Sequence, residues 1–153
     1  MRRIVFAIFI LSLLFSLTLT QRVNIPCSKA SYAIYQGDLV LTGNTVYMIE
    51  GRFDINGSIR VEENATLQLK NAIINFTQTR DFEYEMSFSN PLNGNPRLHA
   101  TNATITSNYR FLIWFYDNST GTFTNCTITN LNAYDCSNIS ILESTVKSLW
   151  MAG

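Results

Sequence analysis

The chain has 153 residues, and its eleven basic and eleven acidic side chains give a formal net charge of zero at pH 7. No basic stripe runs along it, which argues against nucleic acid as a partner. Three cysteines and one histidine lack the spacing of a zinc site. No nucleophile elbow, phosphate loop or histidine-based metal motif occurs, so we predict no catalytic residue.

Residues 1–20 are predicted to be a signal peptide. Arg2 and Arg3 precede an apolar run over residues 4–19, and small residues close that run. This order of a basic, an apolar and a small-residue region is typical of secretory signals. The run is shorter than the ~20 residues that a spanning helix needs, although an uncleaved anchor remains an alternative. We therefore expect a secreted or cell-surface protein.

Residues 21–44 lack the regular pattern that follows, and Pro26, Cys27 and Gly37 indicate irregular structure. We expect these residues to cap the first coil of a solenoid, whose edge would otherwise promote aggregation. The regular part is predicted to occupy residues 45–153.

Residues 55–76 define the repeating unit. Apolar residues alternate with polar ones up to Val61, alternate again from Leu67 to Leu69 after a polar break, and end at Phe76. Three short strands separated by polar corners, within about 20 residues, are typical of one coil of a parallel solenoid.

The unit recurs three times. Residues 69–74 align with residues 100–105, with 123–128 and, more weakly, with 141–146, and the offset between neighbouring segments shortens along the chain. The third position is Asn in the first three segments, and Asn tolerates a left-handed backbone. Stacked Asn side chains form ladders in repetitive β-structures. A structural ladder is predicted from these positions: Asn71, Asn102 and Asn125.

This pattern of short, Asn-rich coils resembles right-handed parallel β-helix proteins, which are secreted or surface-located and include the pectate-lyase-like superfold. The resemblance implies an all-β, right-handed parallel β-helix (β-solenoid) of about four short coils. An antiparallel sandwich is the alternative, because alternating strands with Gly and Asn turns also suit it.

The first two aligned segments, residues 69–74 and 100–105, are the farthest apart in sequence, because residues 79–96 are inserted between them. Residues 81–88 alternate strictly, with Asp81, Glu83 and Glu85 on one face. Two interpretations stay open. This segment is either a projecting loop whose carboxylates hold Ca²⁺, or an extra strand with a solvated acidic face.

The register predicts one binding surface. If the apolar positions point inward, equivalent strands present polar and aromatic side chains outward, Asn132 among them. Exposed aromatic rings stack on sugars, and a basic or acidic neighbour bonds hydroxyls or carboxylates. We therefore predict a ligand-binding face for polysaccharide or cell-surface glycan: Arg60, Glu62, Trp114, Tyr116 and Tyr134. A one-residue slip in register would turn every one of these side chains inward.

Metal, cysteine and glycan signals are weaker. Glu63, Asp117 and Asp135 align at one corner as a possible metal row. Cys126 takes the small inward position of the repeat, which predicts a buried free thiol, with a Cys126–Cys136 bridge as the alternative. Of seven Asn-x-Ser/Thr sequons, Asn64 and Asn118 fall on the same outer corner of different coils and are the best glycosylation candidates, and Asn56 is a further candidate.

These observations predict an exported surface protein with a structural, adhesive or glycan-contacting role. Two other hypotheses remain. One is the N-terminal part of a polysaccharide lyase or glycoside hydrolase, although the Ca²⁺ ligands and basic catalyst of such enzymes have no matching cluster here. The other is a self-assembling subunit joined through the C-terminal edge of the solenoid.

Overall fold

The computed structural model describes residues 32–89, 93–134 and 137–152, so the expected signal peptide lies outside the described residues. The described residues form strands and no helix, and hence contain no helix able to span a membrane. The strands are β1 (Tyr32–Gln36), β2 (Leu39–Leu41), β3 (Val46–Asn56), β4 (Ile59–Glu62), β5 (Thr66–Phe76), β6 (Glu85–Ser89), β7 (Arg97–Thr101), β8 (Thr104–Ser107), β9 (Leu112–Phe115), β10 (Thr120–Thr124), β11 (Thr127–Tyr134), β12 (Asn138–Leu142) and β13 (Thr145–Ala152).

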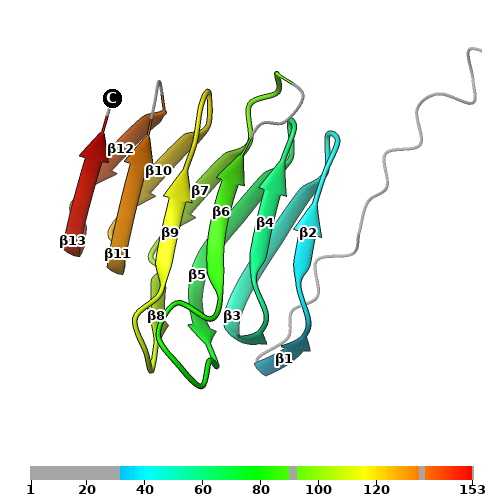
Figure 1. Ribbon diagram of the computed structural model, residues 1–153, viewed down its shortest axis with the longest axis vertical. Helices are drawn as coiled ribbons and strands as arrows, with labels where there is room; N and C mark the ends of the chain where they lie inside the picture. The colour runs from blue at the N-terminus through cyan, green and yellow to red at the C-terminus, as the bar shows by residue number, and fades with distance from the viewer. Residues whose placement is uncertain (1–31, 90–92, 135–136, 153) are drawn as a thin grey trace, which may run out of the picture.

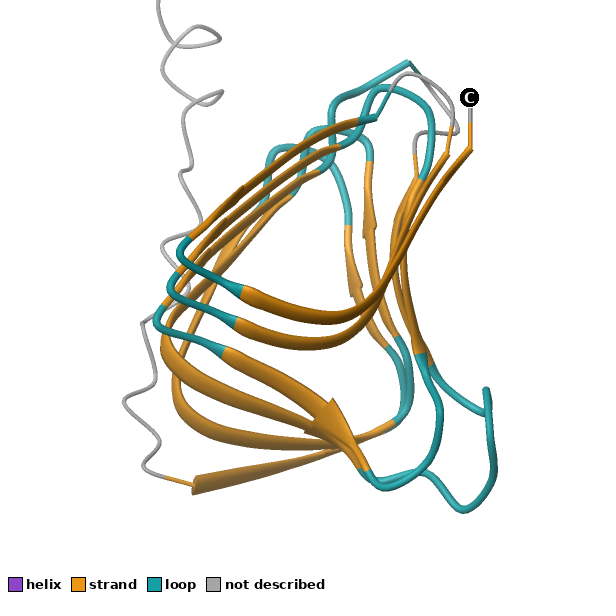
Figure 2. Cartoon of the chain, turned by 90° about the vertical axis from the view of Figure 1, so that its left-hand side faces the viewer, coloured by secondary structure: helices purple, strands orange, loops and turns teal. Residues whose placement is uncertain are grey.

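All pairings among the described strands are parallel, and the chain passes repeatedly through three stacked faces. Face 1 contains β1, β8, the second halves of β3 and β5, and the first halves of β11 and β13. Face 2 contains β2, β4, β6, β9 and the second halves of β11 and β13, which lie side by side across the front of Figure 1. Face 3 contains the first halves of β3 and β5, then β7, β10 and β12. Figure 2 shows the resulting three-sided cross-section.

The predicted repeat alignment is confirmed by the pairing register. Leu69 pairs with Ala100, Ala100 with Phe123, and Phe123 with Ile141. The other end of the unit keeps the same register, because Ile74 pairs with Ile105. The antiparallel sandwich is therefore wrong for the described part of the chain.

Inward positions of the three faces meet in one apolar core. Five phenylalanine side chains are fully buried: Phe76, Phe88, Phe111, Phe115 and Phe123. The rings of Phe88 and Phe115, on adjacent strands of face 2, stack with centroids 4.5 Å apart. Each buried side chain of this size contributes roughly 1.5–3 kcal/mol relative to an exposed one. Stacking successive coils thus buries apolar surface that one coil alone leaves exposed.

The corner between faces 3 and 1 repeats a left-handed residue. The φ angles are 49° at Asn71, 51° at Asn102 and 52° at Asn125. Asn102 Nδ2 donates to Asn71 Oδ1 at 3.0 Å, and Asn125 Nδ2 donates to Asn102 Oδ1 at 2.8 Å. These three residues form the asparagine ladder that the repeat predicts. In the next coil Glu143 takes the equivalent position, with φ 50°.

The regular pairing extends beyond the aligned repeats at two places. First, β1 pairs with β3 and β2 pairs with β4, so parallel pairing already includes residues 32–41 of the expected cap. Second, residues 79–96 contain a strand, as one of the two interpretations has it, and this strand, β6, lies between β4 and β9 as a regular part of face 2. The pairings consequently stack six segments on faces 1 and 2 and five on face 3, more than the four coils expected.

The alternation expected over residues 81–88 holds only in its second half. Met86 and Phe88 are fully buried, as an inward face requires. Phe82 instead is 52% exposed with φ 57°, because it belongs to the corner that precedes β6. Alternation of apolar and polar residues occurs in a strand and also in a corner of similar composition, so it does not distinguish the two.

Candidate functional site

Four aromatic side chains gather on the outer surface of face 2. Trp114 lies in β9, Tyr116 directly follows β9, Tyr134 ends β11 and Trp150 lies in β13. Their odd-numbered neighbours in β9 and β11 are buried: Ile113, Phe115, Leu131 and Ala133. Because successive side chains of a strand point to opposite sides, this burial directs the aromatic rings outward. We call these four residues the aromatic cluster.

The rings of the aromatic cluster contact one another across adjacent strands. Trp114 stacks on Tyr116 and Tyr134, with centroid distances of 5.7 Å and 5.1 Å. Tyr116 and Tyr134 stack at 5.5 Å and 11°. Trp150 meets Tyr134 edge-on, at 4.8 Å and 72°. All four distances are within the range of about 4.5–7 Å typical of favourable aromatic pairs, so the rings form one continuous surface.

The aromatic cluster is partly open to solvent. Trp150 is 51% exposed, and Trp114, Tyr116 and Tyr134 are of intermediate exposure. Burial, and to a smaller extent Glu85 and Tyr134, raise the pKa of the Tyr116 phenol. Tyr116 is therefore neutral at pH 7, and a carboxylate lies near one side of the cluster.

Asn132 lies within the aromatic cluster. It pairs in register with Trp114 on one side and with Trp150 on the other, so a short side chain stands between two indoles. Asn132 is 9% exposed, and its buried Nδ2 has no hydrogen-bond partner. Asn130 of the same strand differs, because its Nδ2 donates to the Phe111 carbonyl at 3.0 Å. An unpaired buried donor is uncommon and calls for an explanation.

The structure separates the predicted binding residues into two groups. The three predicted aromatics are in contact, whereas Arg60 and Glu62 lie on β4, which β6 separates from β9. Two strand spacings are about 9–10 Å. Arg60 also forms an ion pair with Asp38 at 3.2 Å. A strand that the alignment omitted, β6, thus lies between Arg60 and Glu62 and the rings on this face.

Trp150 and the unpaired donor of Asn132 were missed by the sequence reasoning. The last repeat offset, which carries residues 123–128 onto residues 141–146, also carries Asn132 onto Trp150, its partner in the structure. Extending the alignment past residue 146 would thus have found the fourth ring. No sequence signal predicts that Asn132 lacks a partner, since this depends on the packing around its amide.

The predicted metal row is not continuous. Glu63 and Asp117 occupy equivalent corners, with φ 58° and 53°, but the coil containing β6 and β7 lies between them. Glu63 Oε2 accepts a hydrogen bond from the Gly43 backbone N at 2.7 Å. Asp135 lies outside the described residues. Within the parts of the chain that the structure describes, no three His, Cys, Asp or Glu side chains are grouped to hold a metal.

Of the acidic residues before β6, Asp81 bonds to the corner of the next coil and Glu83 bonds within its own corner. Arg110 donates to the Asp81 carboxylate through Nε at 2.9 Å, Nη2 at 2.7 Å and its backbone N at 2.9 Å. These bonds hold the pKa of Asp81 below its usual value. Bonds from Thr79 likewise lower the pKa of Glu83. Two members of the predicted row, Asp81 and Glu83, thus bond to different partners.

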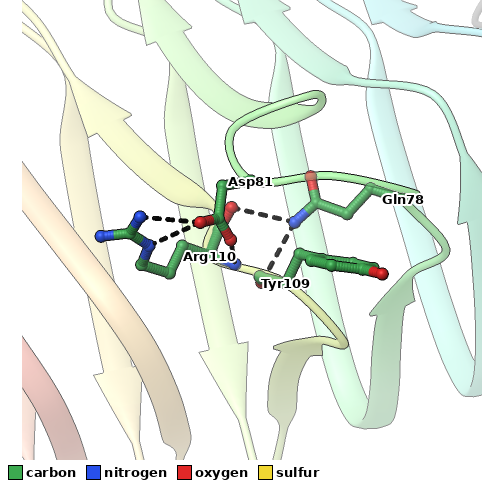
Figure 3. A network of polar contacts seen from close by, with 4 residues as sticks. All are labelled: Gln78, Asp81, Tyr109 and Arg110. Atoms are coloured by element: carbon green, nitrogen blue, oxygen red, sulfur yellow. Dashed lines mark hydrogen bonds and ion pairs between the residues drawn. The ribbon is translucent and has the colours of Figure 1, made fainter.

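A buried amide completes this link between corners, as Figure 3 shows. Gln78 is 3% exposed, and its Nε2 donates to the Tyr109 and Arg110 carbonyls at 3.1 Å and 3.0 Å. Its Oε1 accepts from the Tyr84 backbone N at 3.1 Å. We call Gln78, Asp81 and Arg110 the corner clip. The corner clip thus joins residues of two successive corners.

The candidate glycosylation sites are exposed: Asn56, Asn64 and Asn118. Asn64 Oδ1 accepts from the Asn95 backbone N at 3.0 Å. Asn56 uses both ends of its amide, with Nδ2 donating to Gln36 at 3.0 Å and Oδ1 accepting from Tyr84 at 2.7 Å. Since a glycan attaches at Nδ2, Asn64 and Asn118 suit modification better than Asn56.

Cys126 is a buried free thiol, as predicted, and its Sγ lies 3.3 Å from the Thr124 carbonyl. Cys136 lies outside the described residues.

In comparisons with known proteins, no family model, curated protein or solved structure matches this chain.

Proposed function

We propose that this protein is an exported right-handed parallel β-helix that contacts glycans through the outer surface of face 2. The parallel register across three faces supports the β-helix class. Connections between parallel strands of one sheet are right-handed in the great majority of proteins, which supports the hand. The basic and apolar N-terminal residues support export.

The aromatic cluster is the observation that carries the glycan-contacting role. Aromatic rings offer flat apolar faces, on which the C–H faces of sugar rings pack. The rings lie on adjacent strands, about 4.8 Å apart, a spacing comparable to one sugar residue of an extended chain. Parallel stacking of coils holds them on rigid strands, and Trp150 remains half-exposed. The surface therefore suits a polysaccharide laid across the strands of face 2.

A glycan-array screen of residues 21–153 tests this function. We expect binding by the unaltered protein and at least about tenfold weaker binding by Trp114→Ala. Tyr109→Ala is the matched control, because Tyr109 is 46% exposed but lies in a corner outside the aromatic cluster. Equal retention of the unaltered protein and Trp114→Ala, with both folded by circular dichroism, contradicts the proposal.

A second candidate function is self-association through the last described coil. Ile141, Leu149 and Met151 pair with buried or core-facing partners yet are 36%, 48% and 65% exposed. An added coil would bury this surface, and parallel solenoids are extended in that manner. Sedimentation velocity over a hundredfold concentration range tests the idea. A monomer at every concentration contradicts it, and Met151→Lys should abolish any larger species that forms.

A further inference from the structure

We propose that Asn132 is the hydrogen-bond donor of a neutral-sugar subsite bounded by Trp114 and Trp150. The proposal rests on the glycan-contacting function above and specifies its donor and its ligand class. A pyranose would stack on the aromatic cluster, and one hydroxyl or ring oxygen would accept a hydrogen bond from Asn132 Nδ2.

The first argument is the unpaired donor. Asn132 Nδ2 is buried and has no partner, although other amides such as Gln78 and Asn130 are bonded. Leaving a buried donor unpaired costs stability, so nearly all such groups in native proteins have partners. A ligand oxygen would supply the missing acceptor. The position of Asn132 among rings that suit a sugar makes a sugar oxygen the fitting partner.

The second argument is access. Trp150 is half-exposed and meets Tyr134 edge-on at 72°, whereas the other three rings stack within 27° of one another. Asn132 pairs directly with Trp150, the most exposed ring of the cluster, so a movement of this side chain is the route by which we expect Nδ2 to be uncovered. Rotation of Trp150 toward the stacked orientation would also add a fourth parallel ring. Binding should therefore change the environment of Trp150.

The third argument is charge. Trp114, Tyr116, Tyr134, Trp150 and Asn132 carry no charge at pH 7, so the residues that bound the subsite offer ring faces and one neutral donor. A uronate or sulfated glycan would find no cation among them. The subsite therefore favours neutral pyranoses.

The test uses the two tryptophans of the chain, both of which belong to the aromatic cluster. Intrinsic tryptophan fluorescence thus reports on this surface alone. The probes are cellohexaose, mannohexaose and N-acetylchitohexaose as neutral chains, and hexagalacturonate as the acidic chain. Affinities are measured by calorimetry for the unaltered protein, for Asn132→Leu, which has the same shape and no donor, and for the control Gln68→Leu on face 3.

We expect a neutral probe to bind with a Trp fluorescence shift that persists in Trp114→Phe, where Trp150 alone reports. Asn132→Leu should bind that probe about 3- to 10-fold more weakly, the usual effect of one neutral hydrogen bond. The same variant should unfold at a higher urea concentration, because it removes a buried unpaired donor. A purely structural role for Asn132 predicts the opposite change in stability.

The outcomes separate the two proposals. Unchanged affinity in Asn132→Leu, or tighter binding of hexagalacturonate than of any neutral probe, overturns the subsite while glycan binding stands. Absence of binding to every probe and to the glycan array overturns the glycan-contacting function and the subsite together.

Discussion

Replacing Asn102 by alanine is the most direct test of how the coils are held in register. Asn102 is the middle residue of the asparagine ladder. Its Nδ2 donates to Asn71 at 3.0 Å and its Oδ1 accepts from Asn125 at 2.8 Å, while its backbone has φ 51°. The alanine variant loses both side-chain bonds and places an ordinary Cβ residue in a left-handed conformation.

The expected loss is the sum of two independent contributions. Each neutral hydrogen bond contributes about 0.5–1.5 kcal/mol, and the left-handed backbone costs alanine roughly 1 kcal/mol. Asn102→Ala should therefore lower the free energy of unfolding by about 2–4 kcal/mol. Asn102→Gly removes the same two bonds without backbone strain, so it should lose less. Asn102→Asp retains the acceptor for Asn125 and should lose least.

Urea denaturation followed by circular dichroism measures all three variants, with a common slope as the check that unfolding remains two-state. The order of stability should be Asp, then Gly, then Ala. If Asn102→Gly and Asn102→Ala lower the free energy of unfolding equally, the backbone contribution is refuted. If Asn102→Gly lowers it by less than about 0.5 kcal/mol, the contribution of the hydrogen bonds is refuted.

Single contacts give three further predictions. At pH values above the ordinary aspartate pKa near 3.9, the ionised Asp81 stabilises the fold through its bonds to Arg110. This contribution is lost as the pH falls through the lowered pKa of Asp81. The urea midpoint of Asp81→Asn should therefore depend less on pH below about pH 4 than that of the unaltered protein. Glu143→Asn should extend the asparagine ladder to Asn125 and raise the unfolding free energy by about 0.5–1.5 kcal/mol, and a lower urea midpoint would contradict this. Gly57→Ala should cost about 3 kcal/mol, because its Cβ would overlap the backbone of Gly37 in the preceding coil; an unchanged melting temperature would disprove that contact.

The repeat was predictable from the sequence because the same positions recur wherever the backbone must turn. Asn71, Asn102 and Asn125 mark one corner, and their spacing predicts the register that the structure has. β6 was not identified as a strand of the solenoid, because the preceding corner contains Phe82 and Tyr84, which imitate the alternation of a strand. The Asp81–Arg110 pair was unpredictable for a related reason, since its partners are far apart in sequence and lie in corners of irregular length.

The candidate site was predicted in part. Outward positions of Trp114, Tyr116 and Tyr134 follow from alternation, and the structure brings these rings into contact. The distance of Arg60 from them depends on how many strands intervene, and the alignment undercounted these. Alternation likewise predicts that Asn132 points outward but not that its Nδ2 is buried and unpaired between the strands of Trp114 and Trp150.

The pairing of each coil with only its immediate neighbours has a mechanical consequence. Force applied at β13 loads the bonds to β11 first, and deeper coils bear load only after that coil has peeled away. Successive coils differ in length, since face 3 begins in turn at Val46, Thr66, Arg97, Thr120 and Asn138. Releasing the shortest of these coils, from Thr120 to Asn138, lengthens the chain by about 60 Å, and releasing the longest, from Thr66 to Arg97, by about 105 Å. Unravelling in an optical trap would thus give unequal steps, each identifying the coil that has just detached.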